Sequence, residues 1–336
     1  MGRRAAERIR LDSRHGDHSQ RDVYVGAERS RLPPRNGNQC PSGWPGERAT
    51  SRWPILRDSA QLLPLPRAPS ASPTPHHTNP CRPPEDAVQD PVSVTLTHLS
   101  APVGGSKRLT GHLVRPDGPG PWPGVVVAHE VMGANDEMLR QARRLASAGY
   151  LTLMPDLYTD GGARRCLIPT MRAALSGHGR AYQDIAAART YLVDDPDCTG
   201  AVGIIGFCMG GSFALMAAGS GIFDAASANY GQLPKDMDQA LADACPIVAS
   251  YGGRDRPLKG AAAKLDSALD RLGVVHDVKE YPQAGHAFLN DEQFGPRLLH
   301  PLYRVAGFGP VPEASVDAWL RIEAFFDTHL KQTTKA

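Results

Sequence analysis

Short apolar runs alternate with amphipathic stretches along residues 91–332, and this alternation predicts strands and helices in turn. Residues 124–130 (GVVVAHE) form a continuous apolar run, which is typical of a strand covered on both faces. The helical pattern that follows has Asn135 or Asp136 as its cap and ends at Gly149. The same reasoning predicts strands at 150–158, 201–207, 226–231, 246–253 and 274–282, and helices at 180–195, 212–221, 259–273 and 315–330.

Strands that alternate with helices favour parallel pairing with right-handed crossovers. Residues 92–99 and 108–116 differ, because they alternate like half-buried strands and no helix separates them. We therefore expect an antiparallel start to a mostly parallel sheet with helices on both faces. Residues 91–332 have the usual length of one such α/β domain.

Residues 1–90 have a different composition, with 13 of the 30 prolines, 14 arginines and no lysine. Such a segment cannot bury enough apolar surface to offset its chain entropy, so we expect a disordered tail. It could be an interaction tail, a linker, or translated upstream sequence from a misplaced start codon. The next methionine after Met1 is Met132, inside the expected domain, so a shorter product would need a different start codon.

Charge and cysteine usage exclude several classes of protein. The formal net charge is +2, and no apolar run approaches the roughly 18 residues of a membrane span, so we expect neither nucleic-acid nor membrane partners. The N-terminus leads into no hydrophobic signal segment. The six cysteines are spread out, without the spacing of a zinc site or a disulfide scaffold. We expect a cytoplasmic protein, with a monomer favoured, that needs no metal or cofactor.

A candidate nucleophile follows the apolar strand at 201–207. Gly206-Phe207-Cys208-Met209-Gly210 matches the strand–turn–helix pattern G-x-S-x-G, with Cys in place of Ser. The turn is tight, and side chains two positions before or after the nucleophile would collide, so glycine is needed at both. Cys208 would project from the carboxyl end of the sheet, at a helix N-terminus that favours a thiolate. The alternative is a buried, inert cysteine beside a glycine-rich turn.

An acid and a base follow the nucleophile in the order that α/β-hydrolases use. Asp255 comes directly after the strand at 246–253, and His286 comes after the strand at 274–282. Taken alone, Asp255 could be an ordinary turn residue. Glu130 ends the strand at 124–130 and could bind the thiol or accept its proton, or simply face water. The backbone N–H groups of Val131 and Met209 are the candidate oxyanion donors.

These residues resemble the dienelactone hydrolase family of the α/β-hydrolase superfamily. Four segments carry the resemblance: 129–133 (HEVMG), 155–158 (PDLY), 206–211 (GFCMGG) and 284–288 (AGHAF). The resemblance covers nearly all of residues 91–332. It implies that Cys208 is the nucleophile, His286 the base and Asp255 the acid that orients it. It also implies that Glu130 hydrogen-bonds the resting thiol and helps to form the thiolate.

The family's substrate contacts are less well matched. Known members have an arginine shortly after the base, which helps to hold a substrate carboxylate, whereas this chain has Asn290. Asn290 can donate a neutral hydrogen bond but not a bidentate charged one. Together with Tyr158, it is a candidate for substrate binding. The family's second anion-binding arginine could be Arg164, Arg165 or Arg172, of which Arg172 is the candidate we carry forward.

The sequence thus predicts a hydrolase for a small-molecule ester or lactone, working through a thioester on Cys208. The resemblance implies enol-lactone substrates of aromatic catabolism, as for carboxymethylenebutenolidase. A thioesterase or a general carboxylesterase could use the same residues. The fold could also host a non-catalytic ligand-binding protein. A redox role for Cys208 is weaker, because no second cysteine lies near it in the sequence.

Overall fold

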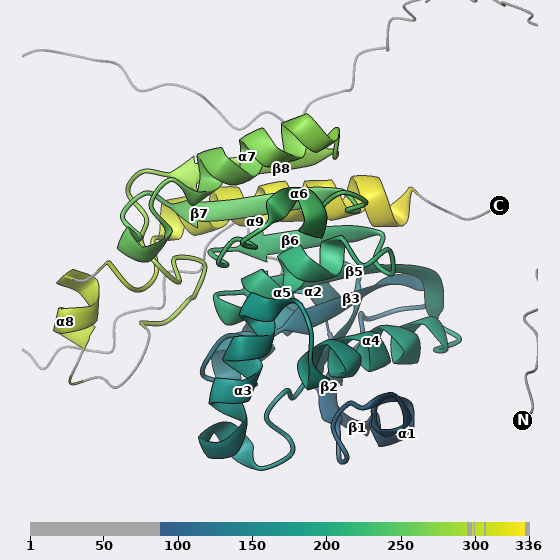
Figure 1. The fold of residues 1–336 in the computed structure, drawn as a ribbon. Coiled ribbons are helices and arrows are strands. Elements are labelled where there is room, and N and C mark those ends of the chain that lie inside the picture. The colour runs from purple at the N-terminus through teal and green to yellow at the C-terminus, as the bar shows by residue number, and fades with distance from the viewer. Residues whose placement is uncertain (1–87, 294–297, 299, 306, 333–336) are drawn as a thin grey trace, which may run out of the picture. The chain divides into compact units, whose positions relative to one another are not determined.

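The computed structural model describes residues 88–293, 298, 300–305 and 307–332 (Figure 1). Its strands are β1 (Val92–Thr95), β2 (Thr110–Val114), β3 (Trp122–Ala128), β4 (Leu151–Pro155), β5 (Cys198–Phe207), β6 (Ala225–Asn229), β7 (Ile247–Gly252) and β8 (His276–Tyr281). Its helices are α1 (Thr97–Ser100), α2 (Asp136–Ser147), α3 (Gly162–Ser176), α4 (Arg180–Val193), α5 (Met209–Ala218), α6 (Met237–Ala240), α7 (Ala261–Leu272), α8 (His300–Val305) and α9 (Pro312–Phe326). Short helical turns lie at η1 (Ala101–Val103), η2 (Arg256–Leu258) and η4 (Asp327–Lys331).

The described strands form one sheet in the order β1-β2-β4-β3-β5-β6-β7-β8. β1 pairs antiparallel with β2, and β2 with β4, while every other pair is parallel. This confirms the predicted antiparallel start to a mostly parallel sheet. The parallel strands end at the same edge, where open α/β sheets bind ligands.

Helices cover both faces of the sheet, as predicted. α4 packs on β3 and β5, and α5 packs on β5 and β6. Figure 1 shows these two helices in front of the sheet and α9 behind it. α2 lies beside α9, because the Arg144 guanidinium binds Glu323 at 3.1 Å and stacks over Trp319 at 4.5 Å.

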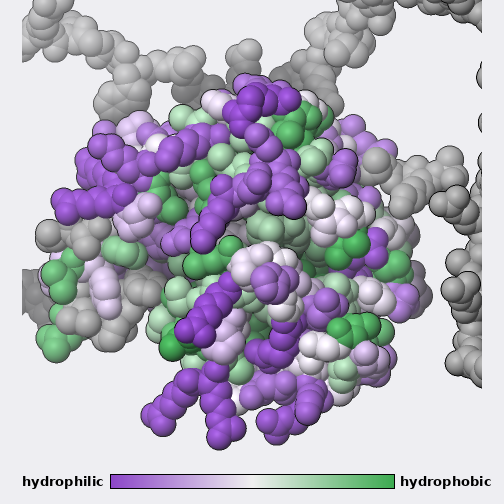
Figure 2. Space-filling view, viewed as in Figure 1, coloured by the Kyte–Doolittle hydropathy of each residue, from purple (hydrophilic) through white to green (hydrophobic). Residues whose placement is uncertain are grey.

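The core lies between these layers and is built from the apolar runs that the sequence analysis identified. The central strands supply fully buried side chains such as Val126 and Ile204, which are neighbours in the sheet. Burying one such side chain is worth about 1.5–3 kcal/mol relative to leaving it exposed. Figure 2 shows hydrophilic side chains over much of the outer face in view, with hydrophobic areas between them. The helices therefore bury one face against the sheet and expose the other face to solvent.

The strand predicted at 92–99 is shorter than expected. Backbone pairing with the segment that leads into β2 ends at Leu96, whose N–H donates to the Leu109 carbonyl. The chain then continues as α1 and η1. A buried carboxylate explains the turn. Asp184 on α4 accepts hydrogen bonds from the Ser106 N–H and hydroxyl, each at 2.6 Å, and Ser106 in turn accepts one from the buried Ser100 hydroxyl at 2.7 Å. These polar contacts hold residues 97–106 against α4 and end the pairing.

Helix α3 was not predicted at all. Its segment begins with two glycines, ends at Gly177 and includes Pro169, all of which favour loops. Packing overrides these local preferences, because α3 buries Cys166, Thr170, Ala173 and Ala174.

Residues 1–87, and with them nearly all of the predicted tail, lie outside the described residues. The description begins with Val88, which pairs with Pro116, and with Gln89, whose N–H donates to the Arg115 carbonyl at 3.2 Å. Contacts with the sheet therefore begin slightly before residue 91. Over the described residues, no helix has the length and apolar character to cross a membrane.

Candidate active site

Cys208 lies at the turn between β5 and α5, in a backbone conformation that residues other than glycine rarely adopt. Its φ is 54° and its ψ is −115°. A Cβ atom on Gly206 would lie 1.9 Å from the Gly210 carbonyl oxygen, and one on Gly210 would lie 1.9 Å from the Ala128 carbonyl oxygen. The turn thus requires glycine at both positions, as the sequence predicted. It presents the partly exposed Cys208 side chain at the carboxyl edge of the sheet.

His286 and Asp255 meet beside this turn. Asp255 follows β7, His286 follows β8, and the His286 Nδ1 lies 2.6 Å from the Asp255 Oδ2. Asp255 is buried. The backbone N–H of His286 donates to the Gly307 carbonyl at 2.8 Å, and the backbone N–H of Gly309 donates to the His286 carbonyl at 3.0 Å. Both peptide groups of His286 are therefore held in place.

The surroundings of His286 raise the pKa of its imidazole to about 10. Burial alone would lower this pKa, but hydrogen bonds to Asp255 and to Cys208, and the negative charges of both, outweigh it. The structure therefore brings together three residues that lie 31 to 78 positions apart in the sequence. Their arrangement suits proton exchange between a thiol and an imidazole.

Glu130 lies just beyond β3 and is 2% exposed. Its Oε1 accepts a hydrogen bond from the Asn135 Nδ2 at 3.1 Å, and its Oε2 accepts a weaker one from the Asn290 Nδ2 at 3.5 Å. Burial raises the pKa of Glu130 more than these two amides lower it. Among the described residues, its hydrogen bonds go to amides and not to the Cys208 thiol, which differs from the contact that the family resemblance implied.

Asn290 therefore has a different setting from the one expected. We predicted that it binds substrate, but it is 3% exposed and also accepts a hydrogen bond from the Tyr230 hydroxyl at 3.3 Å. Its amide holds Glu130 in place behind the site. Asn135, predicted as a helix cap, caps α2 through a 2.9 Å hydrogen bond from the Met138 N–H and holds Glu130 with its other amide atom.

A residue that sequence reasoning set aside, His129, fixes the peptide between Glu130 and Val131. The Leu157 N–H donates to its Nε2 at 3.1 Å, so the ring proton is on Nδ1, which donates to the Glu130 carbonyl at 2.7 Å. Burial lowers the pKa of His129 and keeps the ring neutral. Its signal in the sequence was a polar residue at the end of an apolar strand.

The two candidate oxyanion donors come from different elements, Met209 from α5 and Val131 from the turn that follows β3. Met209 is the first residue of α5, so its N–H has no partner within the helix. The Val131 N–H belongs to the peptide that His129 fixes. Tyr158, predicted to bind substrate, instead donates its hydroxyl to the Val131 carbonyl at 2.9 Å and is 5% exposed.

A cavity of about 260 Å³ opens above Cys208. It is lined by Val131, Met171, Ala174, Leu175, Cys208, Met209, Ser212, Tyr230, Gln232, Pro257, Leu258, His286 and Phe308. Arg172, predicted to bind an anionic substrate, lines a separate cavity with Ser176 and Arg180. Sequence reasoning also missed the α3 residues that form one wall, because it left their segment unassigned.

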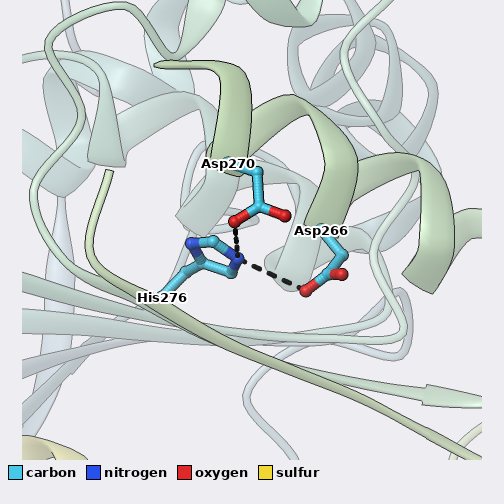
Figure 3. A group of neighbouring side chains, drawn as sticks. All are labelled: Asp266, Asp270 and His276. Carbon is cyan, nitrogen blue, oxygen red and sulfur yellow. Dashed lines mark ion pairs between the residues drawn. The ribbon is translucent and has the colours of Figure 1, made fainter. Parts of the chain in front are cut away.

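A second titratable cluster lies away from this cavity, between α7 and β8 (Figure 3). The His276 Nε2 lies 3.3 Å from the Asp266 Oδ1 and 3.8 Å from the Asp270 Oδ1. The other ring nitrogen of His276 lies 2.7 Å from the Val274 carbonyl. These three side chains could hold a cation, but both carboxylates are at least half exposed, and such exposed acidic groups are common without an ion.

Comparison with known proteins identifies relatives of this chain. A model of the dienelactone hydrolase family matches residues 109–330. A putative carboxymethylenebutenolidase from Methylorubrum extorquens is 30% identical, over 62% of this chain and 72% of its own. Carboxymethylenebutenolidase from Pseudomonas putida is 28% identical, over 55% of this chain and 83% of its own. The crystal structure of a putative dienelactone hydrolase from Klebsiella pneumoniae is 23% identical, covers 71% of this chain and 99% of its own, and superposes with a TM-score of 0.56. The likeness to solved structures shows that the fold is that of the α/β-hydrolases.

Proposed function

The chain belongs to the dienelactone hydrolase family, and on this premise we propose that it hydrolyses a carboxylic ester or lactone through a thioester on Cys208. The observation that carries the proposal is the 2.6 Å pair of His286 and Asp255 beside the strained Cys208 turn. A nucleophile, a base within reach and a third group that orients the base form the general signature of covalent catalysis. A merely structural cysteine would require neither the strain nor the buried pair.

In the first step, Cys208 gives its proton to His286, and the thiolate sulfur attacks the carbonyl carbon, so that its electron pair forms the C–S bond. The carbonyl π electrons move to the oxygen, which accepts hydrogen bonds from the Met209 and Val131 N–H groups. The oxyanion then collapses, the C–O bond to the alcohol breaks, and the leaving oxygen takes a proton from His286. In a lactone, the alcohol stays attached to the acyl chain. Each oxyanion donor contributes about 3–4 kcal/mol to lowering such a barrier.

In the second step, the same His286 acts as a base. Hydrogen bonding to Cys208 and its negative charge help to raise the pKa of His286 to about 10. Both contributions disappear when the sulfur is acylated, so the pKa of His286 falls in the thioester. The ring can then take a proton from water as the water oxygen attacks the thioester carbon. The acid leaves and the thiolate–imidazolium pair is restored.

Glu130 has a supporting role in this proposal. It is buried and lies close enough to His286 for the two charges to interact. A carboxylate there would stabilise the imidazolium form of His286 by its charge, and would so favour transfer of the Cys208 proton to the ring. Asn135 and Asn290 hold it in position.

The test compares wild-type protein with Cys208→Ala, using short p-nitrophenyl esters and a dienelactone. We expect turnover that the variant loses, and an acyl adduct on Cys208 by mass spectrometry, which His286→Gln should accumulate because water is no longer activated. Cys198→Ala is the matched control, since Cys198 begins the same strand β5 at the end away from the turn. Wild-type rates in Cys208→Ala would refute the nucleophile. Absence of turnover and of any adduct in the wild type would favour the ligand-binding alternative.

A further inference from the structure

The cavity above Cys208 is apolar on nearly every side. α3 contributes Met171, Ala174 and Leu175 to its wall, and Leu258 and Phe308 close it from the other side. Among the described residues, no lysine or arginine lines it. Transferring a carboxylate from water to such a wall is unfavourable unless a cation or strong donors replace its hydration.

The cationic residues that could have served an anionic substrate lie elsewhere. Arg164, Arg165 and Arg172 are all exposed on α3. Arg172 opens on a different cavity, because α3 directs Met171, Ala174 and Leu175 toward Cys208 and Arg172 away from it. Arg180, nearby, is used within the fold, where it donates to the Ser106 hydroxyl at 2.6 Å and to the Leu157 carbonyl at 3.0 Å.

Among the described residues that line the cavity, the one cation at the reacting sulfur is the His286 imidazolium, and it is already paired with Asp255 and with the Cys208 thiolate. Glu130 lies buried behind the site, and the proposed thiolate would add a second negative charge. Asn290, the neutral donor predicted to bind substrate, is held between Glu130 and Tyr230. An anionic substrate would therefore meet a carboxylate and a thiolate, with only the already paired His286 imidazolium to offset them.

The apolar side chains at the rim of the cavity are partly exposed to solvent. Met171 is 42% exposed and Leu175 is 48% exposed, although both line the cavity. An apolar group on the substrate would remove part of that surface from water, which favours binding. Met side chains adapt readily to irregular ligands.

We infer that this site selects uncharged esters or lactones, whose apolar group lies against Met171, Leu175 and Phe308, over the anionic lactones that the family name suggests. The inference rests on the proposed function, because it concerns substrates of the Cys208 reaction.

The test uses two p-nitrophenyl esters that match in length and leaving group. One carries a hexanoyl chain and the other the monoester of adipic acid, which ends in a carboxylate. We expect kcat/KM to favour the neutral ester by more than about tenfold, or 1.4 kcal/mol in transition-state binding. The difference should lie mainly in KM, because the charge is remote from the reacting carbon.

A designed reversal sharpens this test. Met171→Arg places a guanidinium at the rim, where it can reach both the cavity and water. We expect it to lower the preference for the neutral ester at least about tenfold, and added salt should restore part of that preference by screening the new charge. Ile168→Arg is the matched control, because Ile168 lies one turn earlier on α3, is 61% exposed and does not line the cavity. It should leave the ratio unchanged.

The outcomes separate the two proposals. A wild-type protein that hydrolyses both esters equally through Cys208, or favours the adipic monoester, overturns the neutral-substrate inference while the thioester mechanism stands. A ratio that moves as much in Ile168→Arg as in Met171→Arg also overturns it, because the cavity wall would not be the cause. If neither ester is cleaved and no acyl adduct forms, the proposed function itself fails and takes this inference with it.

Discussion

Replacing Cys208 by glycine should make the protein more stable than replacing it by alanine. Cys208 has φ 54° and ψ −115°, a region that residues with a Cβ rarely adopt. Both substitutions remove the thiol and its contact with His286. The two variants therefore differ chiefly in whether a Cβ atom remains in the strained conformation.

The size of the effect follows from two opposing terms. Holding a residue with a Cβ in such a conformation costs about 1–3 kcal/mol, and alanine retains this cost whereas glycine does not. Glycine loses more chain entropy on folding, about 0.5–1 kcal/mol relative to alanine. The difference favours glycine by about 1 kcal/mol. In a domain of this size, that corresponds to a rise of roughly 2–4 °C in Tm.

Equilibrium urea unfolding of the two variants measures this difference directly. Ala186→Gly serves as the control, since Ala186 lies in the middle of helix α4, where glycine should be less stable than alanine by about 1 kcal/mol. The same chemical change should thus have opposite signs at the two positions. Cys208→Gly could instead be less stable than Cys208→Ala, by as much as Ala186→Gly is less stable than wild type. In that case the backbone at Cys208 would not be strained, and the physical argument would be wrong.

Three further predictions concern the same site. Gly206→Ala should cost more than about 3 kcal/mol and abolish turnover, because its Cβ would lie 1.9 Å from a backbone oxygen; urea unfolding and an ester assay would show it. Glu130→Gln should be more stable than wild type at pH 8, because burial raises the pKa of the Glu130 carboxyl in the folded protein. The stability that the protonated carboxyl contributes is present below pH 4.5 and is lost as the pH rises through the folded pKa, whereas glutamine stays neutral. Thermal unfolding should therefore show a higher Tm for the variant at pH 8 and no difference near pH 4. Cys208→Ala should lower the pKa of His286 from about 10, which a ¹⁵N NMR titration of the imidazole would measure; an unchanged value would contradict the contact with Cys208.

The sheet and the turn could be predicted because local sequence dictates them. Continuous apolar runs can only be buried strands or helices, and their length and spacing decided between the two. The demand at Gly206 is local, because its Cβ would meet the Gly210 carbonyl four residues later, whereas Gly210 makes room for the Ala128 carbonyl at the end of β3. The motif could still be predicted, because its spacing is typical of this turn. The order of Asp255 and His286 after their strands is likewise a property of the chain.

Other features could not be predicted because they depend on contacts between distant segments. α3 contains glycine and proline signals that favour a loop, and it is helical because four of its side chains pack against the rest of the fold. Asn290 looked like a substrate contact from its position after His286, yet it lies against Glu130, 160 residues away. Spacing along the chain gives the place of a residue at the sheet edge but not the direction of its side chain.

The dipeptide His129-Glu130 shows how two adjacent residues can serve one site through different contacts. His129 accepts a hydrogen bond from the Leu157 N–H, while Glu130 accepts hydrogen bonds from Asn135 and Asn290. The neutral ring of His129 holds the Glu130 carbonyl, and that carbonyl shares its rigid peptide plane with the Val131 N–H. The direction of the proposed oxyanion donor is therefore set by a histidine that never faces the substrate, and the charge of the site is set by the carboxylate next to it.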